Sequence, residues 1–378
     1  MPIPEQRDLE KARRVLGEWL AGRLGVETVA VSEISGPAST GFSNETLIFD
    51  ATWKDTDGNE RTEGLVVRVK PTTYTVFLES DFEAQYRVLE TLGGQTDVPV
   101  PTVRWYEEDA RALGAPFFVM ERLAGQAPTD NPPYTVTGFV FDATPQQRRR
   151  LVDAGFDAMM RIHQLDWRAL KLDFLDKPHH GETGVDQQLG YYEKSFVWAA
   201  RGEPEKYPVA AAALDWLRGN KPAANGPITL CWGDARIANQ MFDEHFDLVA
   251  VLDWEMVTLA DPVMDLAWWL FLERHFTEGI GLPGSLDGFP SRDELVARWE
   301  RALERPAEHL EWYERFAAFR FTVIMMRIGH MLVEFELIPP ELDLAANSIP
   351  AQLLAKDLGL AAPGPPMNAF DTGDGGEG

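Results

Sequence analysis

Three polar side chains carry the strongest chemical signal in this chain. Asp234 and Asn239 are five residues apart, and Asp253 follows at the end of an apolar run. Phosphoryl transfer from a nucleotide uses such a set. One carboxylate orients or deprotonates the attacking hydroxyl, while an amide and a second carboxylate hold magnesium against the phosphates. The set therefore predicts catalysis by Asp234 and metal binding by Asn239 and Asp253.

Short apolar segments should position these three side chains. Residues 228–231 and 248–252 have the composition of strands, residues 240–242 could add a third, and the polar residues 243–247 would form a turn. An antiparallel hairpin of these strands would bring the three side chains together. Each side chain alone could be an ordinary turn residue, but the ordered set at this spacing favours the catalytic interpretation.

Three motifs around these residues make the signal more specific. They are Gly-Asp-Ala-Arg-Ile-Ala-Asn at 233–239, Leu-Asp-Trp-Glu at 252–255 and Asp-Pro-Val-Met-Asp-Leu-Ala at 261–267. The stretch resembles the catalytic segment of the aminoglycoside phosphotransferase family. Within that family it is most similar to a bacterial branch that is also found fused to some acyl-CoA dehydrogenases. The resemblance extends over about residues 30–340.

This resemblance implies both a fold and an activity. The fold would be α+β and two-lobed, like that of protein kinases, with a small β-rich N-terminal lobe and a larger, mainly helical C-terminal lobe. The activity would be ATP- and Mg²⁺-dependent transfer of the γ-phosphoryl group to a hydroxyl of a small molecule. An aminoglycoside-type acceptor, and with it antibiotic resistance, is favoured. A hydroxyacyl-CoA or another small hydroxyl metabolite is the alternative acceptor, and a non-catalytic pseudokinase is the alternative of another class.

Further residues near the motifs receive roles through the resemblance. Trp232 stands where the family usually has histidine. Because that histidine mainly supports the loop, a tryptophan should change packing more than chemistry. Asp265 should steady the catalytic loop, through Arg236 or through backbone amides of the loop. Glu255 could assist the metal, or it could be an ordinary exposed carboxylate.

The N-terminal part of the resemblance predicts the phosphate site. A flexible turn after a strand at 29–34 would lie over the phosphates, although it matches neither Gly-x-Gly-x-x-Gly nor the Walker A motif. Arg68, on a strand at 64–71, would bind the phosphates through its planar fork of donors, and Lys70 is the competing residue on the same face. The candidate contacts in the turn are Ser39, Thr40, Gly41, Ser43 and Asn44.

A helix expected at residues 80–92 should carry the partner of Arg68. Alignment on its leucine spacing puts Gln85 where kinase-like proteins have a glutamate. Glu83 lies two residues away and would point elsewhere on the helix. The usual ion pair is therefore replaced, at most, by a hydrogen bond from Gln85.

A strand at 117–123 should lead into the hinge between the lobes. By resemblance, backbone groups at about Glu121 to Leu123 would hydrogen-bond the adenine, a contact that leaves no side-chain signature. The segment 126–144, rich in Pro, Thr, Asn and Asp, is expected to be a loop that borders the acceptor site.

Composition limits the possible partners. The net charge of −25 argues against nucleic acid and would suit a cationic acceptor, although acidity can also simply aid solubility. The single cysteine, Cys231, excludes an internal disulfide and lies in an apolar run, where a buried thiol is expected. The sequence has no apolar run of about 18 residues and no signal-peptide pattern at its start. These features predict a cytoplasmic enzyme with a small-molecule acceptor and no membrane or readable protein partner.

Apolar periodicity completes the expected organisation. Residues 5–24 should form a helix that packs on the small lobe, and Glu308–Phe335 a long core helix of the large lobe. His163 should be a packed residue, and the pair His179-His180 should lie in a loop without metal. The expected segments are an N-terminal helix at 1–28, a nucleotide-binding lobe at 29–122, a catalytic and acceptor-binding lobe at 123–360 and a disordered tail at 361–378.

Overall fold

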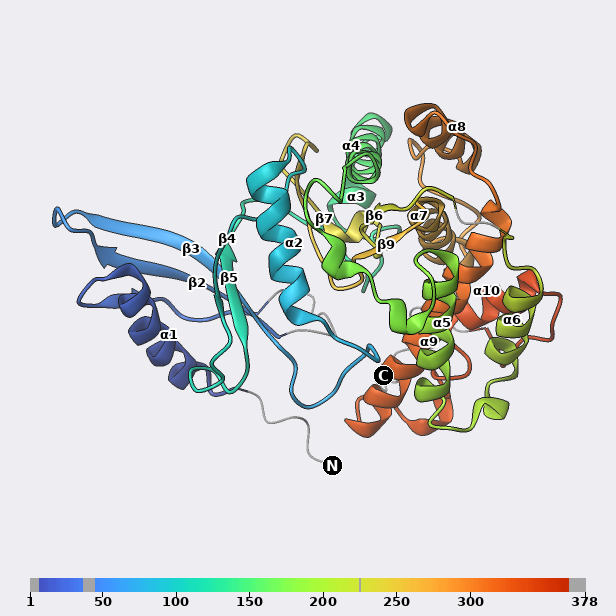
Figure 1. Cartoon of the computed structure of the whole chain (residues 1–378), viewed down its shortest axis with the longest axis horizontal. Helices are drawn as coiled ribbons and strands as arrows, with labels where there is room; N and C mark the ends of the chain where they lie inside the picture. The colour runs from blue at the N-terminus through green and yellow to red at the C-terminus, as the bar shows by residue number, and fades with distance from the viewer. Residues whose placement is uncertain (1–6, 37–44, 224–225, 367–378) are drawn as a thin grey trace, which may run out of the picture.

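The structure of the chain, a computed structural model, has two lobes of different composition (Figure 1). It describes residues 7–36, 45–223 and 226–366. The N-terminal lobe is built on a five-stranded antiparallel sheet, and the C-terminal lobe is mainly helical. This arrangement confirms the predicted α+β class, with a small β-rich lobe followed by a larger helical one.

The sheet of the small lobe has the strand order β1-β2-β3-β5-β4. Its centre is a long hairpin of β2 and β3, in which Glu45 pairs with Val69 and Lys54 with Glu60. Strand β4, at the sheet edge, was not expected from the sequence. The strands are β1 (Val29–Val31), β2 (Glu45–Lys54), β3 (Glu60–Val69), β4 (Val103–Glu107) and β5 (Phe117–Glu121).

Helix α1 (Leu9–Leu24) covers one face of this sheet. The Asp8 side chain caps it by accepting a hydrogen bond from the Lys11 amide at 2.9 Å, so the helix begins at Leu9 and not at residue 5 as predicted. Its fully buried Leu16 and Leu20 form one cluster with side chains of β1, β2, β3 and β5. The helix therefore packs on the small lobe.

Helix α2 (Phe82–Gln95) lies between the two lobes (Figure 1). Its buried side chains, Phe82 among them, belong to the same hydrophobic cluster as the helices of the large lobe. The segment before α2 also reaches that lobe. Tyr74 donates a hydrogen bond to the Arg327 carbonyl at 2.8 Å, and the Arg327 guanidinium donates to the Thr75 carbonyl at 3.0 Å. Packing thus joins α2 to the large lobe, and hydrogen bonds join the segment before α2 to the same lobe.

The large lobe is built around helices α7 and α9. Helix α4 begins at a capping box, in which Thr144 and Gln147 satisfy each other's backbone amides. The helices are α3 (Phe139–Asp142), α4 (Pro145–His163), α5 (Val185–Ala199), α6 (Pro208–Gly219), α7 (Val263–His275), α8 (Arg292–Leu303), α9 (Leu310–Glu334) and α10 (Ile349–Asp357).

Helix α9 is long and apolar enough to cross a membrane by length and composition alone. Of the most apolar stretch of 18 residues in this helix, however, 67% is buried inside the fold. Buried residues such as Phe316, Phe319 and Met326 belong to the core cluster of the large lobe. Its packing is that of a core helix, as the sequence predicted.

Two small sheets lie beside the interface of the lobes. Strand β6 (Thr229–Cys231) pairs with β9 (Thr258–Ala260), and β7 (Gln240–Phe242) pairs with β8 (Leu248–Val251). The turn predicted at 243–247 is therefore confirmed between β7 and β8, whereas the first expected strand pairs with β9, which was not expected from the sequence. Strand β9 takes the place beside β6, because the chain turns back after β8 and runs antiparallel to β6.

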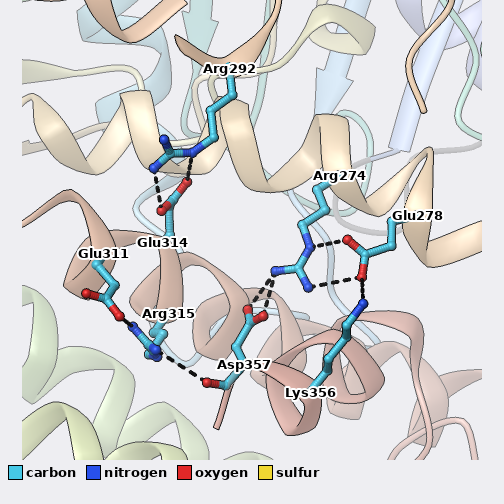
Figure 2. A network of polar contacts seen from close by, with 8 residues as sticks. All are labelled: Arg274, Glu278, Arg292, Glu311, Glu314, Arg315, Lys356 and Asp357. Atoms are coloured by element: carbon cyan, nitrogen blue, oxygen red, sulfur yellow. Dashed lines mark hydrogen bonds and ion pairs between the residues drawn. The ribbon is translucent and has the colours of Figure 1, made fainter. Parts of the chain in front are cut away.

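Ion pairs attach the C-terminal helix α10 to the rest of the large lobe. Figure 2 shows Arg274 of α7 between Glu278 and Asp357, while Lys356 of α10 also pairs with Glu278. The hydrogen bonds from Arg274, with smaller contributions from Lys356, lower the pKa of Glu278 to about 2. These contacts are partly exposed, so each stabilises the fold only modestly.

A close approach in helix α4 gives a test of the packing around the catalytic segment. A Cβ at Gly155 would lie 2.0 Å from Oε1 of Gln240, whose fully buried side chain donates to the Gly155 carbonyl at 2.9 Å. Gly155→Ala should therefore lower the free energy of unfolding by about 1–3 kcal/mol, as overpacking does, despite the better helix propensity of alanine. Chemical denaturation measures this change.

Gly22 in α1 is the matched control, because a Cβ there would meet nothing within 4 Å. Gly22→Ala should leave the stability unchanged or raise it by up to about 1 kcal/mol. Equal stability changes in the two variants would contradict the packing described for Gly155.

The only cysteine of the chain, Cys231, should be inert in the folded protein. It is fully buried at the end of β6, and burial raises the pKa of its thiol well above the usual range. A thiol reagent should find no reactive group in the native protein and one per chain after unfolding. Native-state reaction at the rate of a free thiol would contradict this burial.

Candidate active site

A buried carboxylate on α7 holds the loop that follows β6. Oδ2 of Asp265 accepts a hydrogen bond from the Trp232 amide at 2.7 Å, and Oδ1 accepts one from the Gly233 amide at 3.0 Å. Asp265 is 0% exposed. Of the two contacts expected for it, the structure shows the one with the loop amides, while Arg236 pairs with other carboxylates.

His163, at the end of α4, lies behind Asp265. Its Nε2 is 3.2 Å from Oδ2 of Asp265, and its Nδ1 accepts a hydrogen bond from the Trp299 indole at 3.4 Å. An accepting Nδ1 places the proton on Nε2, so that this neutral ring donates to Asp265. His163 is therefore a packed residue that completes the hydrogen bonds of Asp265.

Asp234 lies in this loop with both carboxylate oxygens in hydrogen bonds. Oδ2 accepts from the Asn239 side-chain amide at 2.6 Å and from Arg236 Nε at 3.2 Å. Oδ1 accepts from the indole of Trp268, on α7, at 2.7 Å. The residue is 8% exposed. The structure thus brings Asp234, Arg236 and Asn239 together, and adds Trp268, which sequence reasoning missed.

Arg236 lies between two carboxylates. One belongs to Asp234 and the other to Asp130, with which it forms a second ion pair. Burial alone would lower the pKa of Arg236, but the charges of Asp130 and Asp234 outweigh it and raise that pKa, so the guanidinium stays charged. Asp130 comes from the loop expected to border the acceptor site. A single aspartate in a polar loop gave no sequence signal.

Asp253 follows β8 and adopts a left-handed backbone conformation, with φ of 53°. The Trp232 indole donates to the carbonyls of Leu252 and Asp253 at 2.9 and 3.0 Å, and the Leu252 amide donates to the Asn239 carbonyl at 2.8 Å. The tryptophan in the usual histidine position therefore supports the backbone at Asp253. These bonds also place Asp253 beside Asn239.

The charges around Asp253 suit a bound divalent cation. Burial raises the pKa of the Asp253 carboxyl, Arg68 opposes this, and repulsion from Asp234 adds to it. A cation between the carboxylates would relieve that repulsion. The Asn239 amide nitrogen is engaged with Asp234, so its carbonyl oxygen, the atom type that magnesium prefers, takes no part in that bond. The residues present therefore fit a magnesium ion.

Glu255 lies two residues beyond Asp253 and is partly exposed. Its amide nitrogen is 3.5 Å from Oδ1 of Asp253. Trp254, between them, is buried and turns its indole to the Val251 carbonyl. The carboxylates of Asp253 and Glu255 therefore lie on the same short segment after β8.

Arg68 reaches the site from strand β3 of the small lobe. Its Nη1 donates to Thr46 Oγ1 at 3.3 Å, and its charge acts on Asp253. Gln85 is buried on α2 and Glu83 is exposed, but within the parts of the chain that the structure describes neither forms a hydrogen bond with Arg68. Lys70 is exposed. Arg68 thus faces the site without the expected helix partner.

Among the residues of the expected hinge, Glu121 to Leu123, one backbone amide is left as a donor for a nucleotide base. The Glu121 amide donates to the Thr102 carbonyl, and the Arg122 amide donates to the Gly64 carbonyl, both at 2.9 Å. Across the described ranges, the Leu123 amide has no such partner. The other expected nucleotide contacts, Ser39, Thr40, Gly41, Ser43 and Asn44, lie outside the described residues.

His179 and His180 approach Glu79 across the two lobes. Their Nε2 atoms lie 3.1 and 3.0 Å from Glu79 Oε1. The Lys194 ammonium is 3.2 Å from Nδ1 of His180, so this nitrogen accepts a hydrogen bond from it. These contacts join the two lobes. Glu79, His179 and His180 also bring one possible ligand atom each within 4.8 Å of one another, so the expectation that this pair binds no metal stays a prediction.

Comparisons with known proteins place this geometry in a family. Residues 41–314 match the model of the APH family, described as the phosphotransferase enzyme family. Acyl-CoA dehydrogenase family member 10 of Mus musculus is 28% identical over 271 residues, which are 70% of this chain and 23% of that protein. Member 11 of Homo sapiens is 27% identical over 237 residues, which are 61% of this chain and 29% of that protein.

The chain thus spans about a quarter to a third of the length of the curated relatives it matches. Among solved structures, a Ralstonia eutropha protein with the provisional name aminoglycoside phosphotransferase has a TM-score of 0.67 at 23% identity, covering 91% of this chain and 97% of that one. The macrolide 2′-phosphotransferase MphH of Brachybacterium faecium has a TM-score of 0.53 at 16% identity, and the match covers 88% of this chain and 96% of that one. These likenesses confirm the kinase-like fold. Because the family model spans well over half of its length, the chain belongs to the APH phosphotransferase enzyme family.

Proposed function

We propose that the chain catalyses ATP- and Mg²⁺-dependent transfer of the γ-phosphoryl group to a hydroxyl of a small molecule. The observation that carries the proposal is the convergence of Asp234, Asn239 and Asp253 at one place, with Arg68 facing them from the other lobe. This is the arrangement that positions a nucleophile, a metal and a phosphate chain in phosphoryl transfer.

Asp234 is the candidate base. Its carboxylate would orient the acceptor hydroxyl and take its proton, a contribution of roughly 10²–10⁴ in rate for a positioned general base. Asn239 and Asp253 would hold the magnesium ion, which neutralises charge on the transferred phosphoryl group when bound. Arg68 would bind the phosphates, and the free Leu123 amide would take the adenine.

For the acceptor we propose a chemical class. Membership of the APH family supports an aminoglycoside-type acceptor, and the net charge of −25 would suit its cationic groups. A hydroxyacyl-CoA is the second candidate, because the matched region lies within proteins named acyl-CoA dehydrogenases. Trp232 and Gln85, which depart from the usual family residues, favour the pseudokinase alternative. Against it, the Trp232 indole donates to the Asp253 carbonyl and so supports the backbone of the proposed metal ligand.

The metal role of Asp253 gives a first test. Asp253→Asn should abolish Mg²⁺-dependent ATP turnover with little loss of stability, because it removes the ligand charge while keeping the side-chain shape. Asp247→Asn, in the exposed turn between β7 and β8, is the matched control and should keep wild-type turnover. Turnover and Mg²⁺ titrations at saturating ATP measure the effect. Wild-type activity in Asp253→Asn would remove this residue from the metal site.

The acceptor class and the base can be tested together. ATP consumption with Mg²⁺ should be stimulated by one member of a panel of aminoglycosides, hydroxyacyl-CoAs, choline and macrolides. In Asp234→Ala that stimulation should fall by about 10²-fold or more, because the positioned base is gone. If ATP binds tightly but no acceptor stimulates turnover in the wild type, the pseudokinase alternative takes precedence.

A further inference from the structure

The hydrogen bonds around Asp234 distinguish its two carboxylate oxygens. Oδ2 accepts two, from Asn239 and Arg236, whereas Oδ1 accepts one, from the Trp268 indole. Each carboxylate oxygen offers about two lone-pair directions. Oδ1 therefore keeps one direction open for a further donor, and Oδ2 keeps none. An acceptor hydroxyl would be received at Oδ1, beside Trp268.

The position of Trp268 is fixed by the helix that carries it. It is 1% exposed, in a run of α7 whose residues Val263–Leu272 are all buried. It stands three residues after Asp265, so both side chains leave the same face of the helix. One face of α7 thus holds the loop backbone through Asp265 and the Asp234 carboxylate through Trp268.

A buried cation lies over the ring face of this indole. The Arg320 guanidinium, on α9, is 4.5 Å from the Trp268 ring centroid and is 1% exposed. Its Nη2 donates to the Gly233 carbonyl at 3.0 Å, while its Nε and Nη1 have no hydrogen-bond partner within residues 7–36, 45–223 and 226–366. A cation over the ring draws electron density from the indole, which makes its N–H a stronger donor.

We propose that Trp268 is a positioning residue of the phosphotransfer reaction, with Arg320 supporting it. Its indole N–H fixes the Asp234 carboxylate so that the open lone pair of Oδ1 faces the acceptor hydroxyl. In the step, the acceptor oxygen bonds to the γ-phosphorus, and the bond to the β–γ bridging oxygen breaks with its electron pair leaving on ADP. The acceptor proton passes to Oδ1. This inference rests on the function proposed above.

The kinetic test removes the indole donor together with part of the ring volume, a loss that the control variant shares. Trp268→Phe should lower kcat about 10- to 100-fold, as expected for loss of a hydrogen bond to a charged group, while the KM for ATP changes less than about twofold. Trp312→Phe is the matched control, because that buried indole donates to the Leu217 carbonyl at 3.0 Å, away from the loop. It should keep wild-type kcat. A kcat in Trp268→Phe within twofold of wild type would overturn the proposal.

A second measurement decides the question if Trp268→Phe does not fold. In the wild-type chain labelled with ¹⁵N-tryptophan, one indole N–H resonance should move strongly upfield on Asp234→Asn, because its charged acceptor is lost. If no indole resonance moves, the hydrogen bond and the proposal both fail. This measurement needs no turnover, so it separates failure of the inference from failure of the proposed function, which absence of wild-type phosphotransfer would reveal.

Discussion

The shape of the catalytic loop depends on a single buried carboxylate. Asp265 accepts hydrogen bonds from the amides of two consecutive loop residues, Trp232 and Gly233, and a third from His163. Removing a carboxylate from water costs several kcal/mol. Hydrogen bonds to a charged group contribute about 1.5–3 kcal/mol each, so three of them can offset that cost. These contacts fix the backbone of the two residues that precede Asp234, and thereby help to position Asp234 relative to Asn239 and Asp253.

The helix that carries Asp265 explains why this constraint holds. Helix α7 is apolar on all sides apart from Asp265 in its buried run, as is typical of a helix enclosed by a core. It packs against α9, which in turn carries Arg320 to the Gly233 carbonyl. The loop is therefore held by two core helices of the large lobe. Catalytic groups placed on so rigid a support lose little freedom when they engage a substrate.

Much of the site could be predicted from the sequence because its motifs are local. The spacing from Asp234 to Asn239 fixes both residues in one loop, and the motif at 261–267 indicates Asp265. Long-range contacts could not be predicted in this way. Strand β9 is only three residues long and pairs with β6 after a separation that no local pattern reveals. Asp130 is a single loop residue, and its partner Arg236 lies far along the chain. Trp268 had a usable signal, since it shares a helix face with Asp265.

The attachment of α2 to the large lobe has a consequence for how the molecule moves. The Arg327 guanidinium lies 4.4 Å from the ring centroid of Tyr74 and 3.8 Å from that of Trp198. Glu79 pairs with His179 across the same boundary between the lobes. A hinge-like rotation of the small lobe would have to break all of these contacts at once. For the same reason, heating should melt both lobes in one cooperative transition.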